Sequence, residues 1–174
     1  MSKKKLTSTN LTSLIDMLAS EDGTIRTKAR KALTALGRPA VTLLIHTLQS
    51  SKLECARWEA AKTLGTIGDR RAIPQLVEAL DDSAPDVAWL AAEALRKFKK
   101  AAWSSLLSLL IKSGSESALL RQRAHHVLLN QKADGFNDLL ATLRKDLESN
   151  TVQGSTPLAA YAILKKMKQI PETA

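Results

Sequence analysis

The sequence predicts an all-α solenoid of about five helical hairpins, on the strength of three observations. Alanine- and leucine-rich segments recur about every 30 to 36 residues. Each repeat holds two apolar stripes at helical spacing, and polar, Gly- or Pro-containing turns separate the segments. Such hairpins cannot bury their apolar faces alone, so stacking of neighbouring repeats must form the core.

The second helix of every repeat carries an alanine followed four residues later by a leucine, which places both on one helical face. These pairs are Ala29 and Leu33, Ala60 and Leu64, Ala91 and Leu95, Ala124 and Leu128, and Ala160 and Leu164. The first helices carry a matching series of core leucines, namely Leu14, Leu44, Leu76, Leu106 and Leu139.

The elements follow in order from a flexible basic tail at residues 1–10, through one repeat domain at 11–170, to a short tail at 171–174. The five repeats are expected at residues 11–36, 41–68, 73–100, 102–132 and 136–170. Gly37 suits the end of a helix and Pro39 the start of the next. Capping boxes are expected at three second helices, formed by Ser51 with Glu54, Ser83 with Asp86, and Ser113 with Glu116.

The segment from Leu64 to Asp82, which contains Gly65-Thr66-Ile67-Gly68-Asp69 and Arg71-Ala72-Ile73-Pro74, resembles the short HEAT-like repeat of the phycobilisome-lyase type. The resemblance covers roughly residues 11 to 170. It implies a right-handed α-α superhelix of the armadillo-like kind, whose second helices line a concave face. It also implies that arginines early in those helices tie one repeat to acidic groups of its neighbour. Those arginines are Arg26, Arg57 and Arg121, and the pattern fails at Ala88 and Pro157.

Composition is that of a soluble, basic protein with a formal net charge of +9. Cys55 is the only cysteine, so an internal disulfide is impossible and a reducing, cytoplasmic setting is expected. We expect no secretory signal, because no apolar segment follows the lysines at residues 3–5. We expect no membrane span, because no run of about 18 apolar residues occurs.

A partner-binding surface is expected on the second helices, centred on Trp58 and Trp89, which occupy equivalent positions in adjacent repeats. Large aromatic side chains among basic residues suit a protein interface or the stacking of bases beside phosphate contacts. Packing of both rings over the groove between repeats is the structural alternative. The surrounding residues expected to be exposed are Leu90, Lys28, Lys31, Lys62, Arg96, Lys97, Arg123 and His126, interrupted by Glu59 and Glu93.

Catalysis is not expected. His125 and His126 are adjacent and point about 100° apart on a helix, whereas a metal pair needs a spacing of three or four residues. Cys55 lies near a helix start beside Arg57, and a structural thiol is the simpler interpretation. We therefore predict no cofactor, no metal and no catalytic residue.

Three functions remain open at this stage. The leading hypothesis is a protein-binding scaffold or adaptor. The second is a nucleic-acid-binding protein, resembling HEAT-like DNA glycosylases, in which Glu59 or Glu93 would supply the carboxylate at a lesion. The third is an accessory subunit like those of the bilin lyases that share this repeat.

Overall fold

The computed structural model describes residues 8–113, 117–148 and 155–169, and every regular element within these ranges is a helix. The chain divides into two compact units, Met1–Ala94 and Leu95–Ala174. The predicted basic tail lies mainly outside the described residues, and the first helix begins at Ser8. The division into one repeat domain with two tails stays a prediction.

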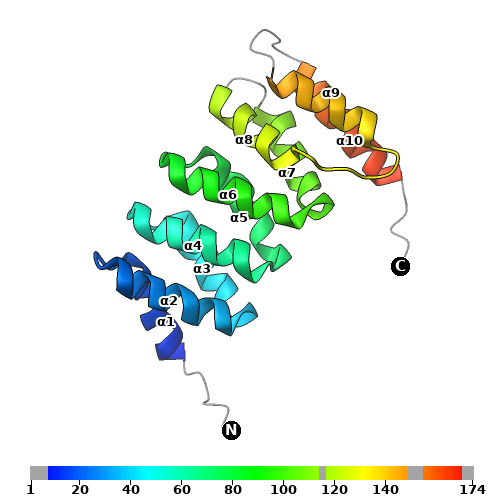
Figure 1. Cartoon of the computed structure of the whole chain (residues 1–174). Coiled ribbons are helices and arrows are strands. Elements are labelled where there is room, and N and C mark those ends of the chain that lie inside the picture. Colours follow the sequence, from blue (N-terminus) through cyan, green and yellow to red (C-terminus); the bar gives the residue numbers. More distant parts are fainter. Residues whose placement is uncertain (1–7, 114–116, 149–154, 170–174) are drawn as a thin grey trace. The chain divides into compact units, whose positions relative to one another are not determined.

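The first unit consists of stacked helical hairpins (Figure 1). The first helices of these hairpins stack on one another and α2 stacks on α4, as repeat packing requires. In chain order the elements are α1 (Ser8–Asp16) with η1 (Met17–Ala19), α2 (Gly23–Leu36), η2 (Arg38–Ala40), α3 (Val41–Ser50), α4 (Glu54–Ile67), η3 (Arg70–Ala72), α5 (Ile73–Glu78), η4 (Ala79–Asp81) and α6 (Pro85–Phe98), whose last turn belongs to the second unit.

The second unit contains α7 (Lys100–Ser113), α8 (Ala118–Leu128), α9 (Asn137–Glu148) and α10 (Ser155–Gln169). Here α7 packs against α10 and α8 against α9. In regular repeat stacking, α7 would pack against α9, the first helix of the next repeat, and α8 would pack against α10. The last hairpin thus departs from the regular order, in keeping with the atypical terminal repeats of solenoids.

The predicted core is confirmed for the second helices. All five repeat alanines are fully buried, as are four of the five leucines that follow them, while Leu164 is half-buried. In the first-helix series Leu44, Leu76 and Leu106 are fully buried, whereas Leu14 and Leu139 are half-buried. Small residues bring the helices close together: a Cβ on Gly65 of α4 would lie 2.6 Å from the Cβ of Ala94 in α6. Any side chain at position 65 therefore forces the two helices apart.

The capping boxes predicted at Ser51 and Ser113 are wrong, and Glu116, the expected partner of Ser113, lies outside the described residues. The box of Ser83 with Asp86 stays a prediction. Leu53 is the N-cap residue of α4 and makes no side-chain cap, while the hydroxyl of Ser51 accepts from the Leu53 N–H at 3.2 Å. In the next loop it is Asp82, accepting from the Ala84 N–H, that orders the chain. The cap of α8 is Ser117, because α7 continues to Ser113. Ser51 and Asp82 accept hydrogen bonds within their loops, whereas Ser117 accepts from the Leu120 N–H at 3.1 Å, three residues into α8.

A left-handed residue ends several second helices. Gly37 and Gly68 have φ values of +66° and +71°, and their N–H groups bond to the carbonyls of Leu33 and Leu64. Lys99 stands at the same point of the next repeat, eight residues after the repeat alanine, with φ +51°. A side chain is strained in this conformation, whereas glycine is not.

Replacing Lys99→Gly should therefore raise the free energy of unfolding by about 1 kcal/mol. Urea denaturation followed by circular dichroism measures it. The reverse change at the equivalent site, Gly68→Lys, should lower stability by about the same amount. Equal stability of Lys99→Gly and the parent protein would contradict the strain argument.

Candidate protein-binding surface

Trp58 and Trp89 occupy equivalent positions on α4 and α6 of the first unit, but their surroundings differ. Trp89 is 50% exposed. Trp58 is half-buried, with the ammonium of Lys62 4.2 Å from its ring centroid and the guanidinium of Arg30 at 5.9 Å. Trp89 is thus the more exposed of the two rings, while Trp58 lies beside cations at a distance where cation–π attraction is favourable.

A pocket of about 410 Å³ opens beside Trp58. Its lining comprises Trp58, Cys55 and Glu54 of α4 and Arg26 of α2. Leu53, immediately before this helix, is 52% exposed. Sequence reasoning missed both the pocket and Leu53; the one available signal was an apolar residue standing in a polar loop.

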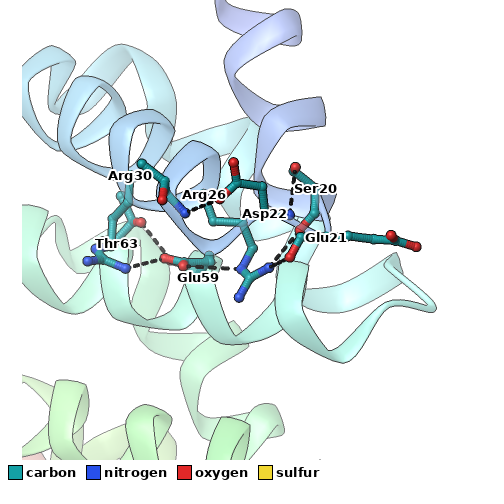
Figure 2. Close-up of polar contacts among 8 residues, drawn as sticks. Ser20, Glu21, Asp22, Arg26, Arg30, Glu59 and Thr63 are labelled. Carbon is teal, nitrogen blue, oxygen red and sulfur yellow. Dashed lines mark hydrogen bonds and ion pairs between the residues drawn. The ribbon is translucent and has the colours of Figure 1, made fainter.

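A buried carboxylate joins α2 to α4 (Figure 2). Glu59 is 3% exposed; its Oε2 accepts from Arg30 at 2.6 Å and its Oε1 lies 3.7 Å from Arg26. Arg26 also donates to the carbonyls of Ser20 and Glu21 at 2.7 and 2.9 Å, which fixes the loop before its own helix. The predicted exposure of Glu59 is wrong, because residues at this helix position face the preceding repeat.

Two of the arginines predicted to link repeats do so, Arg26 through Glu59 and Arg57 through Asp82. The Nε and Nη2 of Arg57 donate to the two carboxylate oxygens of Asp82 at 2.8 and 2.9 Å, a bidentate pair between α4 and the loop before α6. This hydrogen bonding raises the pKa of Arg57. Its Nη1 donates to the carbonyl of Ser51 at 3.0 Å. Arg57 is therefore engaged within the fold.

The remaining predicted residues fall into two groups by unit. In the first unit Lys28 and Lys31 are exposed and Leu90 is half-buried. In the second, Arg96 and His126 are half-buried with Nη1 and Nε2 3.4 Å apart, Lys97 is exposed, and Arg123 is only 8% exposed. The expected exposure of Arg123 is thus also wrong.

Within the described residues no group of three or more His, Cys, Asp and Glu side chains could hold a metal ion. His125 lies 2.9 Å from the exposed Glu148. Glu59, one of the two carboxylates considered for lesion chemistry, is enclosed by two guanidinium groups and has no access to a substrate. None of the described helices has both the length and the apolar character needed to cross a membrane.

Comparison with known proteins agrees with this architecture. Residues 11–96 match the family model described as HEAT repeats. One solved chain with a similar fold belongs to the complex of CpcE and CpcF of phycocyanin lyase from Nostoc sp. PCC7120. The two sequences are 23% identical, the match covers 90% of this chain and 98% of that chain, and the TM-score is 0.62. A comparison with curated proteins gave no match.

The class defined by this fold is the all-α solenoid of stacked helical hairpins. Within that class, the chain is a HEAT-like repeat protein.

The Glu59 ion pair should be a major determinant of stability. Glu59→Gln removes the charge and leaves Arg30 without its carboxylate, so we expect a loss of about 2 kcal/mol in urea denaturation. Glu21→Gln, which neutralises an exposed carboxylate in the same region, is the control and should change stability by less than about 0.5 kcal/mol. Similar effects from the two variants would show that the buried pair contributes no more than a surface charge.

Asp69 provides a pH-dependent contribution. Hydrogen bonds from the side chain and then the backbone of Arg71, and from Arg38, lower the pKa of this carboxyl group. Its stabilisation is complete above the unfolded-state pKa of about 3.9 and is lost as pH falls toward the lowered folded value.

Asp69→Asn keeps an acceptor for the Arg71 N–H but removes the charge. The variant should melt at a lower temperature than the parent protein at neutral pH. This difference should shrink progressively below about pH 4, where the parent loses the contribution. Thermal melts across this range measure it, and a difference independent of pH would rule out the linkage.

Proposed function

We propose that this protein is a non-catalytic scaffold that binds a protein partner through the second helices of its first unit. The observation that carries the proposal is that Trp89 is half-exposed. It occupies the position equivalent to Trp58, and a pocket adjoins Trp58. We name this candidate region the tryptophan surface. It consists of Trp58, Trp89, Leu90, Lys28, Lys31 and Lys62.

The chemistry of this surface suits a protein interface. Tryptophans are enriched among the residues whose truncation costs most in protein complexes, and a neighbouring pocket gives a partner side chain a place to be desolvated. The exposed Leu53 adds apolar area near the same helix start. Lys28 and Lys31 would favour a partner with acidic groups at the rim.

Affinity purification of the tagged protein from its source cells, with quantitative mass spectrometry, tests the proposal. Trp89→Ala should reduce recovery of the specific partner, with a loss of affinity of about tenfold or more when that partner is titrated. The matched control is Leu119→Ala, which removes a similarly exposed apolar side chain, 58% exposed, from the second unit. Undiminished binding by Trp89→Ala with unchanged helicity would eliminate the tryptophan surface.

A second candidate function is favoured by the structural comparison. The matched chain belongs to a two-protein phycocyanin lyase complex, so this chain could act as one subunit of a comparable complex. Co-expression with a phycocyanin subunit and a bilin, followed by absorbance of the denatured product, detects attachment. Bilin attachment that depends on this chain would establish the second function; attachment at the same level without it would exclude that role.

A further inference from the structure

A lysine cluster of the second unit surrounds the start of α9. The ammonium group of Lys100, at the start of α7, lies 4.7 Å from the ring centroid of Phe136. That of Lys166, near the end of α10, lies 5.4 Å from the same centroid and donates to the carbonyl of Gly135. Side chains that are far apart in the sequence are therefore held on one aromatic ring.

This arrangement fixes two like charges close together. Both ammonium groups lie near one centroid, so they are at most about 10 Å apart. Two cations at this distance repel one another, weakly in water and more strongly where protein displaces it. The ring quadrupole and the Gly135 carbonyl offset that repulsion. An anion that contacts both lysines would gain from a geometry that the fold already maintains.

Further lysines of the second unit recur at one sequence position of the later repeats. The residue eight positions after the repeat alanine is glycine in the first two repeats, Gly37 and Gly68. In the three later repeats that residue is Lys99, Lys132 or Lys168, all exposed. Lys99 occupies this position despite its positive φ. We call the resulting region, made of Lys99, Lys100, Lys132, Lys166 and Lys168, the lysine edge.

We propose that the lysine edge binds the phosphate backbone of nucleic acid without sequence preference. Duplex DNA carries one negative charge per about 1.7 Å of helix axis, so lysines about 10 Å apart can each neutralise a phosphate. The ammonium group of lysine acts as a point charge. Unlike the planar guanidinium of arginine, it cannot donate a bidentate pair of hydrogen bonds to a base edge. Phe136 is fully buried, which prevents a base from stacking on it and leaves contact with phosphates.

Two acidic residues weaken this edge without reversing its sign. Asp134 and Asp138 are exposed on either side of Phe136 and are outnumbered by the lysines. The proposed binding therefore depends mainly on charge and should be strongly salt-dependent. The lysine edge shares no residue with the tryptophan surface, so either proposal can fail without the other.

Fluorescence anisotropy with a labelled duplex of about 20 base pairs tests this proposal over a series of NaCl concentrations. Lys100→Gln with Lys166→Gln should weaken binding roughly tenfold at about 100 mM salt and reduce the salt slope by about 2. The control is Lys52→Gln with Arg70→Gln, which removes two exposed cations from the first unit and should alter affinity less than about twofold.

Because Lys166 contacts the buried Phe136, the first double variant could lose binding by unfolding. A second double variant controls for this. Lys132→Gln with Lys168→Gln changes two exposed side chains and should also weaken binding and reduce the slope. Equal losses in the edge and control variants, or no binding at about 25 mM salt, would overturn the proposal. Tighter binding of poly-L-glutamate or of phosphatidylserine vesicles than of the duplex would also overturn it, in favour of an acidic protein or a membrane.

Discussion

The close approach of second helices in neighbouring repeats is the constraint on which the first unit depends. Alanine at the repeat position and Gly65 at the contact with Ala94 leave space for backbone-to-backbone packing. Larger side chains there would separate the helices and expose the leucines beneath. The same approach brings α2 and α4 near enough for Arg30 to reach Glu59, and for Arg26 to line a pocket with Trp58.

Ion pairs between repeats supplement this packing, and they determine which charged side chains can contact a ligand. Arg57 is bound to Asp82, and Glu59 is enclosed by two arginines. Neither can therefore serve a ligand without disturbing the stack. Trp89, Lys28 and Lys31 are exposed and can contribute to recognition. The distinction between structural and available charges follows from which side of each helix meets a neighbouring repeat.

Most of the fold could be predicted from the sequence, because alanine and leucine at fixed intervals report directly on burial. The errors came from positions where periodicity alone is insufficient. Glu59 and Arg123 were wrongly expected at the surface. For Glu59, contact with the preceding repeat buries a wider arc of the helix than one apolar stripe indicates. The capping box expected at Ser51 failed because the hydroxyl of Ser51 accepts a hydrogen bond inside its own loop. The pocket beside Trp58 needs two helices to form, and no single segment reveals it.

The position of Cys55 has a practical consequence. It is the only cysteine in the chain, it is half-buried, and it lines the pocket beside Trp58. One thiol-directed fluorophore would thus mark this pocket in the unmodified sequence, without engineering a background free of competing thiols. Its emission, and its energy transfer from the adjacent indole, would give an optical signal for occupancy while any partner is titrated.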